Sequence, residues 1–130
     1  MSFVGESGSG HSVVLDGSPE HGGRNLGIRP MEMMLIGLGG CTAFDVVLML
    51  QKSRQKVVDV EVSLDAERAE DVPHVFTAIT AHFKVWGHDL SEKHVERAVN
   101  LSAEKYCSAT KMLEKSATIA YSWEILDAGS

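Results

Sequence analysis

The stretch from Met31 to Leu50 constrains this chain more than any other, because it is apolar on every side if it is helical. Glu32 and Asp45 are its only acidic or basic residues. Pro30 precedes it, and proline suits the first helical position because its missing N–H has no helical partner there. We expect a helix from Pro30 to about Ser53. A helix that is apolar all round must be covered all round.

Two kinds of cover are open, a membrane or protein. A membrane is disfavoured because each of the two acids costs roughly 2.5–3.5 kcal/mol near the bilayer centre. A helix of ~30 Å is also long for one small subunit to enclose. We therefore expect an obligate homodimer, with this helix central and its glycines, including Gly39 and Gly40, at a close crossing. The alternative is a sheet that wraps the helix within one subunit.

Short β-prone segments surround this helix. Residues 3–5 and 12–16 flank a Gly- and Ser-rich turn and predict a hairpin. Residues 58–66 alternate strictly, and residues 74–87 predict the second strand of an antiparallel pair. Residues 117–125 alternate again. The side chains expected to face the core are Val58, Val60, Val62, Leu64, Ala66, Val75, Ile79, Phe83, Val85, Ile119, Tyr121, Trp123 and Ile125.

Two further helices are expected between the strand at residues 74–87 and the strand at residues 117–125. The first begins at a capping signature, Ser91 with His94 or Asp89 with Glu92, and runs to about Tyr106. The second is short and covers residues 108–116. Strand pairs separated by helices predict an α+β fold, and the length predicts one domain over residues 1–130.

Charge and cysteine content narrow the partners and the compartment. The net charge is −6 and no run of Lys and Arg offsets it, which argues against nucleic-acid binding. The first residues lack a basic segment followed by a long apolar one, so we expect no secretory signal. With two cysteines only, a reducing cytoplasm is expected. A cysteine pair there does chemistry more often than it forms a structural bridge.

The two cysteines lie in different settings. Cys41, in "LGGCTAF", is within the central helix, and Cys107, in "EKYCSATKML", is at a helix boundary 66 positions later. Unpaired N–H groups of the following helix favour a thiolate at Cys107. Spacing alone leaves open a functional pair or two buried apolar fillers. There is no CxxC motif and the six histidines are scattered, so no metal site is expected.

Two motifs together carry a resemblance to a known family. "RPMEMMLIGLGGCTAFDVV" resembles the signature helix of the OsmC/Ohr family of thiol peroxidases, and "LSAEKYCSATKML" resembles its second-cysteine motif. Within the family the chain is similar to the YhfA-like subgroup. The resemblance implies an intertwined α+β homodimer, in which antiparallel β-sheets from both subunits wrap two central helices. It implies two active sites at the subunit interface.

The implied activity is reduction of organic hydroperoxides in defence against oxidative stress. Cys41 corresponds to the peroxidatic thiolate, which would become a sulfenic acid. Cys107 corresponds to the resolving cysteine, which would form an intrasubunit disulfide with it. A dithiol, of the lipoyl-protein or thioredoxin type, would reduce that disulfide by exchange. The resemblance implies no metal, no bound cofactor and no membrane or nucleic-acid partner.

The charged residues of the family site match in part. The family takes an activating Arg from the N-terminal hairpin, which here reads "GESGSGH" and holds none; Arg24 and Arg29 are candidates. Glu32 matches the family acid, and it would act across the dimer or at its own helix N-terminus. Asp45 follows Cys41 by four residues on the same helical face. A carboxylate there raises a thiol pKa unless it is itself paired.

The missing Arg keeps a second function open. On the same fold, the interface pocket would bind a small apolar or electrophilic ligand, or sense redox state, with weak or no peroxidase activity. A protein whose cysteines only fill the core is the third reading.

Overall fold

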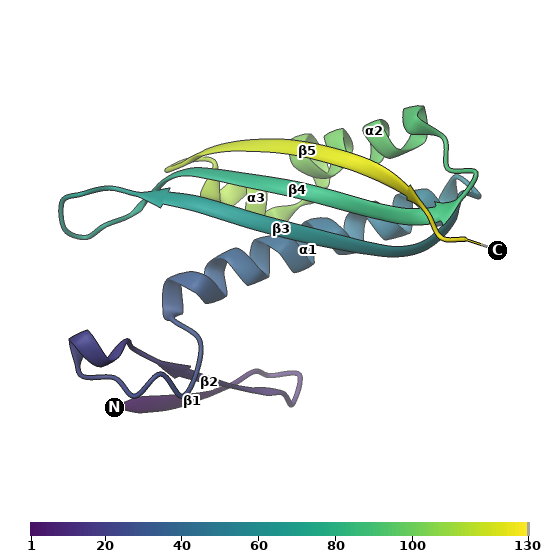
Figure 1. Cartoon of the computed structure of the whole chain (residues 1–130). Helices are drawn as coiled ribbons and strands as arrows, with labels where there is room; N and C mark the ends of the chain where they lie inside the picture. Colours follow the sequence, from purple (N-terminus) through teal and green to yellow (C-terminus); the bar gives the residue numbers. More distant parts are fainter. Residues whose placement is uncertain (130) are drawn as a thin grey trace. The chain divides into compact units, whose positions relative to one another are not determined.

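The computed structural model describes residues 1–129, which form two compact units, residues 1–36 and the residues from Gly37 on. Figure 1 shows the elements in the chain order expected from the sequence, strand pairs alternating with helices. The α+β class is therefore confirmed. Each unit is described separately below.

The N-terminal unit holds the expected hairpin. Strand β1 (Ser2–Glu6) pairs antiparallel with β2 (Ser12–Asp16), and a 3₁₀ turn, η1 (Pro19–His21), follows. Asp16 ends β2 and is almost fully buried. Its carboxylate accepts hydrogen bonds from the backbone N–H groups of Gly17 at 2.7 Å, Arg24 at 3.2 Å and Leu26 at 3.1 Å. One buried side chain thus closes the loop from residue 17 to residue 26.

The larger unit is built on a three-stranded sheet of order β3–β4–β5. Strands β3 (Lys56–Arg68) and β4 (Phe76–His88) form the expected antiparallel pair, but β5 (Thr118–Asp127) runs parallel to β4. The expectation of purely antiparallel sheets is therefore wrong. The reason is the helical segment between β4 and β5, which returns the chain to the starting end of β4, as parallel neighbours require.

The helices match their expected places with one interruption. Helix α1 covers Pro30–Lys52, α2 covers Glu92–Leu101 and α3 covers Ser108–Leu113. The helix expected to continue to Tyr106 instead changes into a π-helical turn, η2 (Ser102–Tyr106). Ser91 is the N-cap residue of α2, so the helix starts where the Ser91 signature predicts. The predicted capping hydrogen bond from its side chain is wrong, because the Ser91 side chain makes none.

The core lies between the sheet and the helices, which Figure 1 shows behind the sheet. Ile79, Phe83 and Val85 are buried as expected. Val75 is exposed because β4 begins after it, and Val58 is exposed because a bulge between Val57 and Asp59 shifts the register, so that Val57 faces the core instead. Ala66 is exposed too. The central cluster contains Val46, Leu50, Ala81, Phe83, Val85, Val95, Ala98 and Val99.

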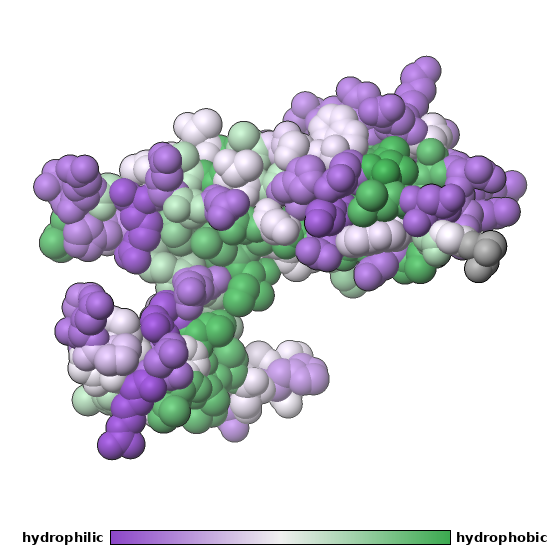
Figure 2. All heavy atoms as spheres, in the orientation of Figure 1, coloured by the Kyte–Doolittle hydropathy of each residue, from purple (hydrophilic) through white to green (hydrophobic). Residues whose placement is uncertain are grey.

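Helix α1 is covered on one side only. The side facing the sheet buries Leu38, Gly39, Thr42, Val46 and Leu50. The opposite side exposes two glycines and two large apolar side chains, and Figure 2 shows apolar residues on the visible surface of the larger unit. These four, Gly37, Gly40, Phe44 and Leu48, are called the exposed α1 face below. Helix α1 is also long and apolar enough to cross a membrane, a property that the core helix of a soluble protein can share.

Gly39 and Gly40 differ in their surroundings, which corrects the expectation that both mark a helix crossing. A Cβ on Gly39 would lie 2.7 Å from Cδ1 of Leu64, so Gly39 permits close packing of α1 on β3. A Cβ on Gly40 would meet nothing within 4 Å. Gly39 thus serves the subunit's own core, and only Gly40 is free for another contact.

We expect Gly39→Leu to lower the free energy of unfolding by about 1–3 kcal/mol, the usual cost of overpacking a core. Met112→Leu, at a side chain 76% exposed on α3 and away from the exposed α1 face, is the control and should leave the packing within the subunit intact. Urea unfolding followed by the fluorescence of Trp86 and Trp123 measures both. Equal losses in the two variants would contradict this assignment of Gly39.

Asp16 predicts a pH-dependent stability of the N-terminal unit. Burial alone would raise the pKa of its carboxyl, but the N–H groups of Gly17, Leu26 and Arg24 and the amino terminus outweigh it and hold the pKa below the ordinary 3.8. Because the folded-state pKa is the lower one, the stabilisation is complete above about pH 4 and is lost as the pH falls through the folded-state value. We expect Asp16→Asn to remove this acid dependence, measured by hydrogen exchange of residues 17–28 between pH 6 and 3. An unchanged pH profile would refute the role of the carboxylate.

Candidate functional site

The fold brings Cys41 and Cys107 together. Their sulfur atoms and a carboxylate oxygen of Asp45 all lie within 4.8 Å of one another. Cys41 is half-buried on α1, whereas Cys107 is fully buried at the start of α3. Both thiols are free. The two motifs that the sequence places 66 positions apart therefore form one site, which we call the thiol site.

The π-helical turn η2 places Cys107. The backbone N–H of Cys107 donates to the carbonyl oxygen of Ser102 at 2.8 Å, and this hydrogen bond closes the turn. The Cys107 sulfur then caps α3 by accepting the N–H of Thr110 at 3.4 Å. Turns of this kind interrupt α-helices most often at functional sites. Here the turn sends the chain inward so that the thiol reaches α1.

The pKa of the Cys107 thiol is raised by burial, which disfavours the thiolate. The hydrogen bonds from Thr110 act in the opposite direction and the neighbouring Cys41 adds to the rise. The hydroxyl of Thr110 is in turn bonded to the Tyr121 hydroxyl at 2.7 Å, which ties the start of α3 to β5. Cys107 is thus the less accessible of the two neighbouring thiols, and burial favours its protonated form.

Asp45 is fixed by a buried chain of hydroxyl groups. Ser102 Oγ donates to Asp45 Oδ2 at 3.0 Å, and Thr42 Oγ1 lies 2.8 Å from Ser102 Oγ. Because the Ser102 proton is given to Asp45, Thr42 is the donor in the second bond. Asp45 forms no salt bridge among residues 1–129. Asp45 was identified from the sequence, but Thr42 and Ser102 were missed. The only feature in the sequence that could have indicated them is a hydroxyl side chain at a position facing the core.

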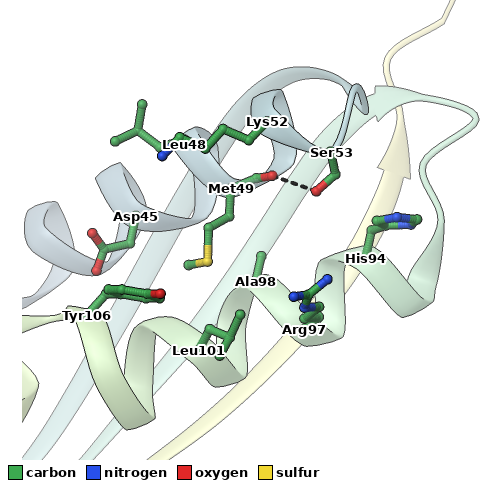
Figure 3. A pocket seen from close by; sticks show the side chains of 10 residues that line it. All are labelled: Asp45, Leu48, Met49, Lys52, Ser53, His94, Arg97, Ala98, Leu101 and Tyr106. Carbon is green, nitrogen blue, oxygen red and sulfur yellow. Dashed lines mark hydrogen bonds between the residues drawn. The ribbon is translucent and has the colours of Figure 1, made fainter.

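A pocket of about 630 Å³ begins beside this site, between α1 and α2. Figure 3 shows Asp45 and Tyr106 at one end and His94 and Ser53 at the other. Nδ1 of His94 is buried and has no hydrogen-bond partner among the described residues. The pocket is lined by Asp45, Leu48, Met49, Lys52, Ser53, His94, Arg97, Ala98, Leu101 and Tyr106.

The other expected site residues belong to the N-terminal unit. Glu32 is exposed, and its carboxylate accepts the N–H of Arg29 at 2.8 Å, so it acts at its own helix N-terminus, one of the two readings left open. The Arg29 guanidinium donates to Asn25 Oδ1 and to the carbonyl of Gly27. Arg24 is held through its backbone N–H by Asp16. Catalytic roles for these residues stay predictions.

Comparison with known proteins gives agreeing results. The family model described as OsmC-like protein matches residues 21–122. Protein YhfA of Escherichia coli K12 is 51% identical over 128 residues, covering 98% of this chain and 92% of that protein.

Solved structures share the fold. A hypothetical protein from Aquifex aeolicus is 31% identical with a TM-score of 0.85, covering 98% of this chain and 89% of that one. An organic hydroperoxide resistance protein from Legionella pneumophila is 14% identical with a TM-score of 0.68, covering 95% of each chain, and it shows the fold alone. The matched length and the identity to YhfA together establish that this chain belongs to the OsmC-like family.

Proposed function

We propose that this protein reduces organic hydroperoxides with Cys41 and Cys107 as a dithiol pair. The observation that carries the proposal is the approach of the two sulfur atoms to within 4.8 Å. A disulfide needs the sulfurs about 2.05 Å apart, and modest side-chain rotation of the half-buried Cys41 supplies the difference. Membership of a family that includes proteins named for hydroperoxide resistance supports it.

The difference in exposure supports the two proposed roles. The Cys41 thiolate, which is the accessible one, attacks the terminal oxygen of the hydroperoxide; the O–O bond breaks, the alcohol leaves with one proton and Cys41 becomes a sulfenic acid. Cys107 then attacks the Cys41 sulfur, water leaves and the disulfide forms. An external dithiol of the lipoyl or thioredoxin type regenerates both thiols. The pocket beside Asp45 offers the apolar wall that an organic substrate requires.

The exposed α1 face supports the predicted homodimer. Phe44 is 67% exposed and Leu48 39% exposed on a helix where neither has a covering partner in the subunit. Residues three or four positions apart share a helical face, so Cys41 lies beside Phe44, at the edge of the exposed α1 face. A second protomer seated there would bury these side chains and enclose the peroxidatic thiol. A cytoplasmic location goes with this proposal, because thiols that cycle through a disulfide suit a reducing compartment.

A second candidate function is ligand binding or redox sensing with weak catalysis. Two observations favour it. No cation pairs with Asp45 within residues 1–129, and the pKa of Cys107 is raised. The pocket has polar side chains able to hold a ligand, including Lys52 and Arg97.

A thiol count separates the two candidates. We expect reduced protein exposed to cumene hydroperoxide to lose both thiols and to consume peroxide, because the sulfurs are near enough to bridge. Cys41→Ser should abolish peroxide consumption, and Cys107→Ser should leave Cys41 trapped as a sulfenic or higher oxide. Ellman titration and intact mass measure these states. Thiols that persist at high peroxide in a folded protein would favour the second function.

Asp45 predicts the reactivity of Cys41. Removing a carboxylate within 4.8 Å of the thiol favours the thiolate, so Asp45→Asn should speed alkylation of Cys41 by iodoacetamide at pH 7. The Cys107→Ser background isolates the Cys41 signal. Asp59→Asn, on the exposed side of β3, is the control. An alkylation profile unaltered by Asp45→Asn would mean that the carboxylate does not act on Cys41.

The exposed α1 face predicts the assembly. Phe44→Glu places a charge at its centre and should convert the dimer to monomer in sedimentation velocity experiments. Met112→Glu, at an apolar position 76% exposed on α3, is the matched control and should remain dimeric. A parent protein that sediments as a monomer at micromolar concentration would refute the dimer itself.

A further inference from the structure

We propose that Cys41, Asp45 and Cys107 also form a binding site for a thiophilic divalent cation, with Zn²⁺ as the fitting ion. Nothing in the expected peroxide chemistry requires a metal. The proposal needs only the reduced thiols and the carboxylate, whose ligand atoms lie within 4.8 Å of one another. The sequence does not predict this metal site, because Cys107 lies far along the chain from Cys41 and Asp45 and the three residues match no common spacing of zinc ligands.

The distances suit one small ion. Zinc bonds to sulfur at about 2.3 Å and to carboxylate oxygen at about 2.0–2.2 Å. Tetrahedral ligands around it therefore lie roughly 3.3–3.9 Å apart. The separations here need a contraction on the order of 1 Å or less, and Cys41, which is only half-buried, retains the side-chain freedom to supply it.

The surroundings fix two of the three ligands as metal sites require. The Ser102 hydroxyl donates to Asp45 and is itself bonded to Thr42, while the N–H of Thr110 donates to the Cys107 sulfur. Such outer hydrogen bonds orient ligands and tune their affinity. Ser102, Thr42 and Cys107 are fully buried, so this support is rigid.

Charge and ligand type select the ion. On binding, the two thiols give up their protons to solvent. The resulting two thiolates and the carboxylate carry three negative charges, and Asp45 has no salt-bridge partner in the described chain, so a dication offsets their repulsion. Thiolate ligands disfavour Mg²⁺ and Ca²⁺, which prefer oxygen, and the carboxylate favours Zn²⁺ over Cu(I). Three protein ligands leave the fourth position of a tetrahedral ion for water.

The proposed function gives this site a consequence, which rests on that function. A zinc-bound pair is closed to the hydroperoxide until the ion leaves. When oxidation does occur, the two thiolates supply two electrons to the O–O bond, the S–S bond forms, and alcohol and water leave with two protons. The disulfide has lost the two thiolate charges and cannot rebind Zn²⁺ until it is reduced. Metal occupancy would then report the reduced state.

Equilibrium dialysis of the reduced full-length protein against ZnCl₂ alone tests the proposal. We expect one zinc per chain, no binding by the disulfide form or by Cys107→Ser, and a Kd weakened about tenfold or more in Asp45→Asn and in Ser102→Ala. Circular dichroism confirms that each variant is folded. Co²⁺ in place of zinc should give a sulfur-to-metal charge-transfer band that Cys107→Ser diminishes. His82→Ala removes an exposed histidine next to Glu124 and should bind zinc like the parent.

Absence of binding by the reduced parent protein would overturn the site, as would equal binding by the disulfide form. Peroxide consumption, measured on the same preparations without metal, keeps the two proposals apart. A protein that consumes peroxide but takes up no zinc contradicts the metal site alone. A protein that binds zinc through these ligands but leaves peroxide intact supports the metal site and contradicts the proposed function.

Discussion

The packing of one side of α1 onto the sheet and α2 is the constraint on which the rest depends. Val46 and Leu50 are buried against β4 and α2, and Gly39 lets the helix approach Leu64 of β3. Because α1 is apolar all round, seating one side leaves the other exposed. Cys41 falls at the border between the two sides. The same helix thus supplies part of the core, an exposed apolar face and the accessible thiol.

The thiol site is held by a second, polar constraint that links distant parts of the chain. Thr42 and Asp45 on α1 are joined through Ser102, the first residue of the π-helical turn that also positions Cys107. Buried hydroxyl groups persist in a core only when they are hydrogen-bonded. Their bonds therefore favour one relative placement of α1 and η2, and with it one separation of the sulfurs.

Sequence reasoning recovered the elements and the two cysteines but not every contact. Strict alternation found β3 and β5, and the apolar run found α1, because periodicity is a local property. The bulge that turns Val58 outward, the parallel pairing of β5 and the π-helical turn depend on tertiary packing and leave no local pattern. Ser102 was missed for the same reason, since an isolated serine in a helical segment reads as a surface residue.

The sulfur of Cys107, which caps α3, connects oxidation at the thiol site with the structure of α3 and β5. Six residues are too few to sustain a helix by themselves, so α3 relies on its cap and its neighbours. The N–H of Thr110 donates to the Cys107 sulfur, which is the atom that a disulfide with Cys41 would use. The hydroxyl of Thr110 is in turn bonded to the hydroxyl of Tyr121 on β5. Oxidation of Cys107 would therefore weaken the cap of α3, and the bond between Thr110 and Tyr121 would carry that disturbance to β5.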